Sequence, residues 1–267
     1  MRQLDGLRAL AVSIVLLHHW IPQMYQPVEH LGRLGVLLFF VLSGYLITGI
    51  LLQGRELVQS GVESSGFVLK RFYIRRFLRI FPIYYAILIA GWLLHEDIIR
   101  ETMPWNVSYT TNFYFAFRGE WQSSISHLWS LSVEEQFYLI WPALILFLPS
   151  RVLPSAILGI ILAAPLIRGL GSLAGLNPIA AWVVTPACLD TLGAGAFLAL
   201  TQHSPDRIPG WLRSKSSWLP WIGLASLLGV MELGRLRGDT ALYLSLYDSS
   251  AALIFVYLVA RASRGFS

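Results

Sequence analysis

The 267-residue sequence contains little charge and almost no cysteine. Only 13% of its residues are charged and 55% are hydrophobic, whereas about 25% of the residues of a soluble domain are charged. This shortage of charge argues against a soluble domain and favours a protein that crosses a membrane several times. Cys188 is the single cysteine, which excludes a disulfide within the chain, and its apolar neighbours predict a packing role.

The sequence also lacks an internal repeat, a low-complexity tract and a long linker, so we expect one membrane-embedded domain over residues 1–267. A helix that crosses a bilayer needs about 20 mainly apolar residues. Runs of this kind occupy residues 4–23, 34–53, 77–95, 129–149, 152–168, 179–201, 217–234 and 241–260. The sequence therefore predicts an all-α fold, a multi-pass transmembrane bundle of eight spans.

The basic residues favour one orientation of this bundle. They lie at the ends of apolar runs rather than on one polar face, so the net charge of +5 does not indicate a nucleic-acid partner. Cytoplasmic loops of membrane proteins carry an excess of Lys and Arg, and on this basis we expect cytoplasmic N- and C-termini in the inner cell membrane. Six of the 20 basic residues then fall on the outer side: Arg33, Arg100, Arg118, Arg168, Arg235 and Arg237.

Arg8 and His19 lie eleven residues apart in the first apolar run. Eleven helical steps of about 100° place both side chains on one face, about 16 Å apart along the axis. Polar residues inside a membrane segment are costly and usually mark a functional site. Asp5 can pair with Arg8, and a histidine exchanges a proton readily near neutral pH. The alternative is an arginine that reaches the headgroups and a histidine that simply ends a helix.

Arginines gather at the start of the third apolar run. Arg75, Arg76 and Arg79 fall within an arc of about 100° on a helix, at the predicted cytoplasmic boundary. Their guanidinium groups suit a phosphate-bearing ligand because each can bind phosphate oxygens through two hydrogen bonds. The alternative is ordinary anchoring to anionic lipid, which we favour for Lys70 and Arg71.

Two adjacent carboxylates, Glu134 and Glu135, enter the fourth run from the predicted outer side. His127 precedes Glu134 by seven residues and Tyr138 follows it by four, so the three side chains lie nearly on one helical face. The alternative is that the carboxylates only complement the dipole at the start of a helix.

Two other features are less specific. Ser43 and Gly44 allow another backbone to approach closely, as is common in membrane bundles. Asp190 is an intramembrane carboxylate for which the sequence indicates no partner. The outer connection over residues 96–126 is rich in aromatic residues, which predicts an interfacial belt or a cover over an acceptor site.

Taken in order, these motifs resemble the acyltransferase-3 family of integral-membrane acyltransferases. The matching segments are Asp-Gly-Leu-Arg-Ala at 5–9 followed by His19, Phe-Phe-Val-Leu-Ser-Gly at 39–44, Arg-Phe-Leu-Arg at 76–79, and Trp-Ser-Leu-Ser-Val-Glu-Glu-Gln-Phe-Tyr at 129–138. Family members commonly have an aspartate where this sequence has Leu37. They also commonly have more spans, so a domain truncated at its C-terminus is an open alternative.

The resemblance implies the transfer of an acyl group, often acetyl, from cytoplasmic acyl-coenzyme A to a hydroxyl of an extracytoplasmic glycan or lipid-linked sugar. It implies no metal. Membrane lipids are the expected surroundings. A transporter, which would also need buried polar residues, and an inactive membrane scaffold remain alternative functions.

Under this reading the candidate residues divide into a donor site and a reaction site. Arg75, Arg76, Arg79 and Tyr138 are expected to bind the coenzyme A, with Arg8 along the path of its acyl arm. His19 is expected to act as general base on the acceptor hydroxyl, and Glu134 or Glu135 to orient the acceptor or carry the proton. Direct transfer and a covalent acyl-histidine both remain open.

Overall fold

The computed structural model describes residues 2–20, 31–122, 125–204, 218–237 and 240–264. Within these ranges the chain forms helices and turns without a β-strand, which confirms the predicted all-α fold. The chain divides into two compact units. Unit 1 comprises Met1–Gly49, Ser150–Gly175 and Pro186–Ser267, and unit 2 comprises Ile50–Pro149 and Leu176–Thr185. The helix α2 (Leu31–Gln59) contributes its first part to unit 1 and its last turns to unit 2.

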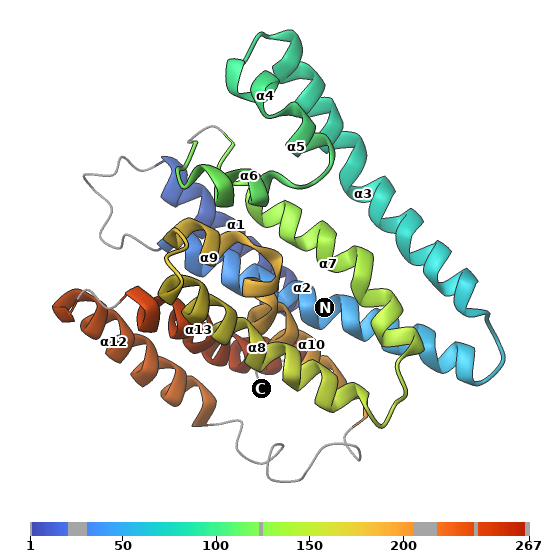
Figure 1. Ribbon diagram of the computed structural model, residues 1–267. Coiled ribbons are helices and arrows are strands. Elements are labelled where there is room, and N and C mark those ends of the chain that lie inside the picture. Colours follow the sequence, from blue (N-terminus) through green and yellow to red (C-terminus); the bar gives the residue numbers. More distant parts are fainter. Residues whose placement is uncertain (1, 21–30, 123–124, 205–217, 238–239, 265–267) are drawn as a thin grey trace. The chain divides into compact units, whose positions relative to one another are not determined.

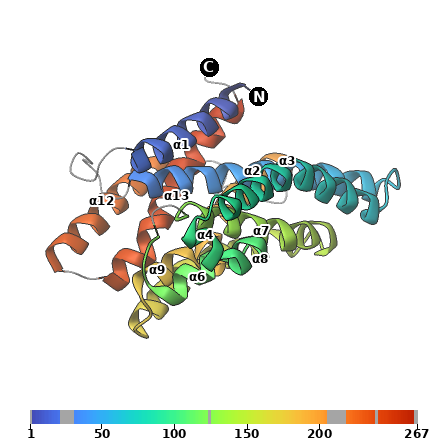
Figure 2. The ribbon, with the colours of Figure 1, turned by 90° about the horizontal axis from the view of Figure 1, so that it is seen from above.

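Unit 1 is a bundle of long helices around α13 (Thr240–Arg264). Its other helices, besides the first part of α2, are α1 (Arg2–Trp20), α8 (Leu153–Leu173), α10 (Leu189–His203) and α12 (Leu219–Arg237). The four helices α1, α8, α10 and α12 lie directly against α13 (Figure 1), and α2 contacts it through Leu37, which packs on Tyr247 and Ala251. The start of α1 lies beside the end of α13 (Figure 2), where Leu4 and Val259 share one apolar core. These two ends of unit 1 therefore lie on the same side of the bundle.

Glycines set the closest helix crossing in unit 1. A Cβ atom on Gly44 of α2 would collide with the carbonyl oxygen of Leu192, and one on Gly195 of α10 with the carbonyl oxygen of Val41. The two backbones therefore touch, and only glycine fits on either side of the contact. This confirms the packing role predicted for the Ser43–Gly44 stretch.

Unit 2 contains two long helices, α3 (Ser65–Leu93) and α7 (Leu128–Phe147). Short helices fill the predicted outer connection between them: α4 (Asp97–Glu101), α5 (Met103–Val107) and α6 (Thr111–Arg118). A fourth short helix, α9 (Pro178–Val183), comes from a later part of the chain. It packs with α7 against α6.

Five helices among the described residues are long and apolar enough to cross a membrane: α2, α3, α8, α12 and α13. Each overlaps one of the eight predicted spans. The first and fourth predicted spans are helical as α1 and α7, but their charged and polar residues lower the mean hydropathy. Eight membrane crossings therefore stay a prediction.

The predicted span over residues 179–201 is wrong as one continuous helix. The chain ends α9 at Val183, continues through an extended Val184 and a 3₁₀ turn, η2 (Thr185–Cys188), and starts α10 at Leu189. Pro186 lacks a backbone N–H and disfavours a helical conformation at the residue before it. The helix therefore breaks at this proline.

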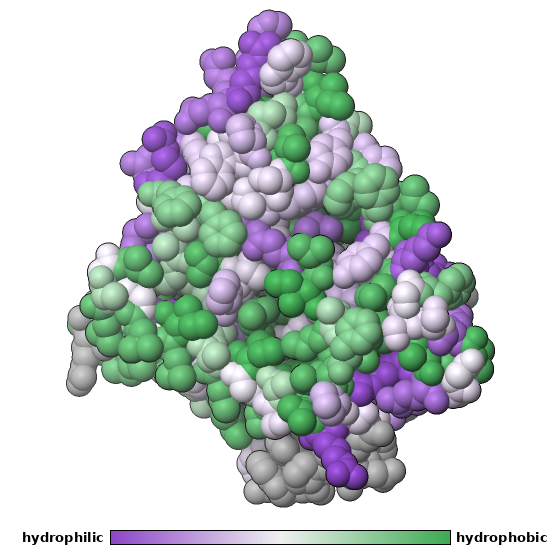
Figure 3. Space-filling model, turned by 45° about the vertical axis from the view of Figure 1, so that its right-hand side comes forward, coloured by the Kyte–Doolittle hydropathy of each residue, from purple (hydrophilic) through white to green (hydrophobic). Residues whose placement is uncertain are grey.

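Hydrophobic side chains cover much of the face shown in Figure 3. On α3 alone, Phe77, Leu78, Ile83 and Ile87 are each more than half exposed. Exposed apolar surface on this scale is typical of lipid contact. Together with the five candidate spans, it identifies an integral membrane protein.

Two of the six basic residues assigned to the outer side are buried. Arg33 and Arg168 are buried within unit 1, and Arg168 has no exposed surface. A count of basic residues at the ends of apolar runs cannot recognise an arginine whose partners lie in the protein interior, so these two residues lend no support to the predicted orientation. Arg207, Arg213 and Lys215, assigned to the inner side, lie outside the described residues. The predicted orientation of the termini stays a prediction.

Candidate active site

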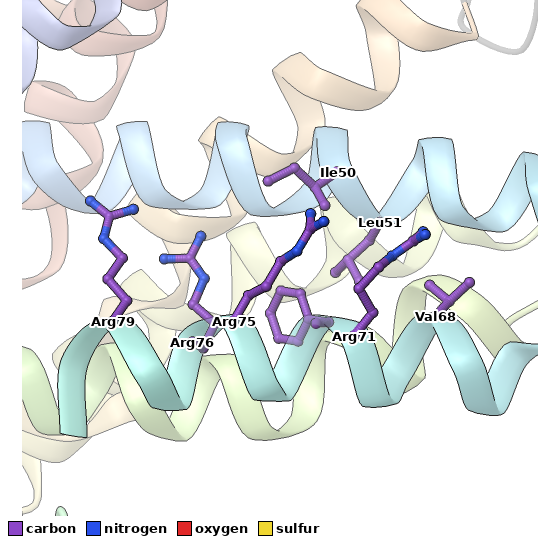
Figure 4. Close-up of a pocket in the computed structure, with 8 residues that line it drawn as sticks. Ile50, Leu51, Val68, Arg71, Arg75, Arg76 and Arg79 are labelled. Carbon is purple, nitrogen blue, oxygen red and sulfur yellow. The ribbon is translucent and has the colours of Figure 1, made fainter. Parts of the chain in front are cut away.

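The predicted arginine cluster lies on α3. This helix begins after Ser64, whose hydroxyl accepts a hydrogen bond from the backbone N–H of Phe67 at 3.2 Å and so satisfies one donor at the helix start. Arg71, Arg75 and Arg79 then recur every four residues, and positions at this spacing share one helical face. Figure 4 shows their side chains extending from the same side of α3.

These arginines, with Arg76, line a cavity of about 200 Å³ within unit 2 (Figure 4). Its remaining lining is apolar: Ile50, Leu51, Val68 and Phe72. The guanidinium groups attract an anion, and the apolar residues beside them reduce its contact with water, which strengthens the attraction. The structure therefore brings the three predicted donor-site arginines together around one space, and the ligand they bind stays a prediction.

The cavity arginines differ in their partners. Arg71 donates to both carboxylate oxygens of Glu63, at 2.6 and 2.8 Å, a partner that the sequence did not indicate; its contact with anionic lipid stays a prediction. Arg75 and Arg79 are exposed and make no hydrogen bond or ion pair with any described residue. Their donors are available for a phosphate-bearing ligand.

Arg76 connects the cavity with α7. Its guanidinium group lies 5.0 Å from the ring centroid of Tyr138, which is buried, in a cation–π contact. It also interacts electrostatically with Glu134 and Glu135. Tyr138 and both predicted carboxylates therefore interact with the same cavity arginine, Arg76.

The two carboxylates have different surroundings because adjacent helical residues point about 100° apart. Glu134 is buried, at 5% exposure. Glu135 is half-buried, and its Oε1 is buried without a hydrogen-bond partner among the described residues. Tyr84, Tyr85 and Tyr109 all interact electrostatically with Glu135.

Tyr109 is at the centre of this aromatic group. Its ring centroid lies 4.5 Å from that of Tyr84 and 5.1 Å from that of Phe81. The hydroxyls of Tyr84 and Tyr85 donate to the carbonyl oxygens of Asn106 and Val107, each at 2.9 Å. Burial raises the pKa of the Tyr109 phenol above its usual value, so the phenol remains a hydrogen-bond donor at any physiological pH.

Gln136 of α7 holds the segment that connects α3 with α7. Its amide donates to the carbonyl oxygen of Tyr109 at 2.7 Å and to Asn112 Oδ1 at 3.0 Å. Its own Oε1 accepts a short hydrogen bond from the hydroxyl of Thr185. The sequence motif contains Gln136, but nothing in its spacing indicated these partners.

The predicted pair Arg8 and His19 belongs to α1 in unit 1. Arg8 pairs with Asp5 at 3.2 Å, as the spacing predicted. His19 is exposed, and its Nδ1 lies 2.8 Å from the carbonyl oxygen of Val15. A carbonyl can only accept, so Nδ1 carries the hydrogen and Nε2 is the basic nitrogen of the neutral ring. Because Glu134 and Glu135 belong to unit 2, their predicted cooperation with His19 stays a prediction.

Sequence reasoning missed a buried charge network in unit 1. Arg168 donates to both carboxylate oxygens of Asp190, at 3.1 and 2.6 Å, and lies 3.6 Å from Asp248. Arg33 donates from Nε to Asp248 at 2.8 Å. Asp190 thus has a partner. Asp248, inside the last predicted span, was the remaining signal that could have revealed the network.

Leu37, where the family commonly has an aspartate, is buried in an apolar cluster with Tyr247 and Ala251. One turn earlier on α2, Arg33 pairs with Asp248 of α13. This part of α2 therefore has a carboxylate beside it, supplied by another helix.

The described residues contain no group of three or more His, Cys, Asp or Glu side chains that could hold a metal ion.

Three curated relatives show what the chain is similar to. It is 37% identical over 179 residues to the peptidoglycan O-acetyltransferase OatA of Listeria monocytogenes, which covers 61% of this chain and 27% of the relative. It is 36% identical over 161 residues to a putative O-acetyltransferase of Staphylococcus aureus, covering 54% of this chain and 24% of the relative. It is 34% identical over 158 residues to the putative peptidoglycan O-acetyltransferase YrhL of Bacillus subtilis, covering 52% and 23%.

The matched part thus spans about a quarter of the length of these relatives. No solved structure matches the chain. The family model described as an acyltransferase domain matches residues 1–264, nearly the whole sequence. The family named from the motifs is confirmed, and the chain belongs to the acyltransferase-3 family of membrane acyltransferases.

Proposed function

We propose that this protein transfers an acetyl group from cytoplasmic acetyl-coenzyme A to a hydroxyl of peptidoglycan or a related glycan outside the inner cell membrane. Membership of an acyltransferase family supports the reaction type. The names of the bacterial relatives support acetyl as the group and peptidoglycan as the acceptor. Coenzyme A as the carrier is our own inference from the site.

The arginine-lined cavity carries this proposal. Coenzyme A bears several phosphate groups, and Arg75, Arg76 and Arg79 offer paired N–H donors suited to phosphate oxygens. The apolar residues of the lining add surface for the less polar parts of the donor, and Tyr138 supports donor binding through its cation–π contact with Arg76. The residues present therefore fit a phosphate-bearing acyl donor, and the thioester of that donor supplies the activated acyl group.

His19 is the proposed general base. Its Nε2 accepts the proton of the acceptor hydroxyl while the hydroxyl oxygen forms the new ester bond and the carbon–sulfur bond breaks. The proton finally leaves with the sulfur. Glu134 or Glu135 orients the acceptor or carries this proton. Arg8 lies along the path that the acyl arm of the donor takes from the cytoplasmic side of the membrane to the outer side. General-base assistance of this kind contributes about 10²–10⁴-fold in rate.

The test is transfer by the purified chain in lipid nanodiscs. We would incubate it with isotopically labelled acetyl-coenzyme A and unmodified peptidoglycan fragments, and locate the label on the sugar by mass spectrometry. We expect labelled sugar with the wild-type chain and a loss of about 10²-fold or more for His19→Ala. His18→Ala is the matched control, because that ring points about 100° away from His19, and it should retain activity.

Two results would contradict this proposal at different points. A near-wild-type rate for His19→Ala would overturn the assignment of the base but leave the reaction standing. Absence of labelled sugar, together with absence of coenzyme A binding, would overturn the reaction and favour a transporter or an inactive scaffold.

A further inference from the structure

The backbone of Tyr109 has an unusual conformation beside the α7 carboxylates. Its φ is 53°, in the left-handed region that a bulky side chain rarely adopts. Three contacts hold it there. The N–H of Tyr109 donates to the Asn106 carbonyl at 3.1 Å, its own carbonyl accepts from Gln136, and its ring stacks on Tyr84. Strain maintained by surrounding contacts is concentrated at functional sites in proteins.

Two buried polar atoms in this region lack a hydrogen-bond partner among the described residues. One is the hydroxyl oxygen of Tyr109, whose residue is only 7% exposed, and the other is Oε1 of Glu135. The neighbouring hydroxyls of Tyr84 and Tyr85, by contrast, both donate to backbone carbonyls. Buried polar groups are nearly always satisfied, so an unsatisfied pair points to a functional partner.

The two atoms have complementary chemistry. The phenol of Tyr109 offers a hydrogen, and the carboxylate oxygen of Glu135 offers a lone pair. Gln136, the residue after Glu135, donates to the Tyr109 carbonyl at 2.7 Å, so Tyr109 and Glu135 belong to one local cluster, and the two groups interact electrostatically. An alcohol both accepts and donates a hydrogen bond, so a single hydroxyl group placed between the two atoms would satisfy both. A water molecule could make the same two hydrogen bonds. A glycan hydroxyl differs because the rest of its sugar ring can make further contacts with the protein.

We propose that Tyr109 and Glu135 together bind the acceptor hydroxyl, Tyr109 by donating to its oxygen and Glu135 by accepting its hydrogen. Gln136 is a positioning residue that acts by holding the carbonyl of Tyr109. This inference rests on the proposed function for the identity of the acceptor, and it deepens that function by naming the acceptor-binding pair. The location agrees with an extracytoplasmic acceptor, because Tyr109 belongs to the predicted outer connection.

The experiment compares variants that differ by one hydroxyl. Tyr109→Phe keeps the stacked ring and removes only the donor. Tyr85→Phe is the matched control, because its hydroxyl donates to a backbone carbonyl in the same cluster. For each nanodisc-embedded variant we would measure equilibrium binding of unmodified peptidoglycan fragments, the KM values for fragments and acetyl-coenzyme A, and thermal stability.

For Tyr109→Phe we expect fragment binding about tenfold weaker, as for the loss of one hydrogen bond to a partly charged site. The KM for fragments should rise to match, while the KM for acetyl-coenzyme A and the melting temperature stay unchanged. Tyr85→Phe should bind fragments as the wild type does. Gln136→Leu should raise the KM for fragments as well, and Gln136→Glu, which cannot donate to the Tyr109 carbonyl, should not restore it.

Unchanged fragment binding in Tyr109→Phe, with a folded protein, would overturn the acceptor-binding pair and leave Tyr109 as a packing residue. Equal weakening in Tyr109→Phe and Tyr85→Phe would overturn it too, because the effect would then come from the aromatic cluster as a whole. Because binding is measured without the donor, these outcomes stand apart from a failure of acetyl transfer.

Discussion

The two units contain arginines in opposite settings. In unit 1, Arg33 and Arg168 are buried and each pairs with an aspartate. In unit 2, Arg75 and Arg79 are exposed, line a cavity and have no carboxylate partner among the described residues. Both groups occur in mainly apolar helices, so the amino-acid type alone does not distinguish them.

Burial and pairing distinguish the charged residues that stabilise this fold from those that are available to bind a ligand. A charge removed from water must be paired, because an unpaired one costs several kcal/mol or more. The network of Arg168 meets this requirement with two aspartates, Ser249 and three backbone carbonyls. Arg75 and Arg79 remain exposed, so their N–H donors are available to bind a ligand rather than to stabilise the fold.

The largest effect is expected from breaking the buried network. Arg168→Leu leaves Asp190 buried without its partner and should reduce the free energy of unfolding by about 3–5 kcal/mol. The measurement is thermal or denaturant unfolding in detergent. The double variant Arg168→Leu/Asp190→Leu keeps the Arg33–Asp248 pair and should recover part of the loss. Unchanged stability in the single variant would show that these charges do not hold the helices together.

An intermediate effect is expected from a cavity arginine, on ligand binding rather than on stability. Arg79→Ala should weaken coenzyme A binding about 10- to 100-fold, as for the loss of charged hydrogen bonds to phosphate. The melting temperature without ligand should stay the same, and the rise caused by coenzyme A should disappear. Arg235→Ala is the control, because that arginine is an exposed residue of α12 that pairs with Glu232. A loss of ligand stabilisation in both variants would point to nonspecific charge effects.

The smallest effect is expected from an exposed ion pair. Asp5→Asn removes the partner of Arg8, but Asp5 is two-thirds exposed. Exposed pairs of this kind contribute about 0.5 kcal/mol or less. The melting temperature should therefore barely change. A loss as large as that of Arg168→Leu would mean that burial is not what separates the two kinds of arginine.

Much of the helical architecture could be predicted from the sequence because it depends on local patterns. Apolar run length located the long helices, and the four-residue spacing of Arg75 and Arg79 placed them on one side of α3. Ser43–Gly44 indicated a close helix contact because glycine has the same consequence in any bundle. These predictions needed no knowledge of which helices are neighbours.

Features that depend on distant partners could not be predicted in this way. Arg168 was counted among the outer basic residues, and its burial was not foreseen because its partners, Asp190 and Asp248, come from other helices. The φ of Tyr109 results from hydrogen bonds to Asn106 and to Gln136, the second of them far along the chain. The break before α10 was different: Pro186 was visible in the sequence, but the length of the apolar run led to the prediction of one continuous span.

The contact at Gly44 and Gly195 has a consequence for how relatives of this protein are recognised. Replacement of either glycine forces two backbones apart, so the residues around Gly44 are constrained by assembly whether or not the chain retains catalysis. A genome survey that relied on this stretch would collect degenerate paralogues together with working enzymes. Sorting the two would require the state of groups such as the Arg79 guanidinium and the Tyr109 hydroxyl, whose loss we expect to leave the stability of the fold unchanged.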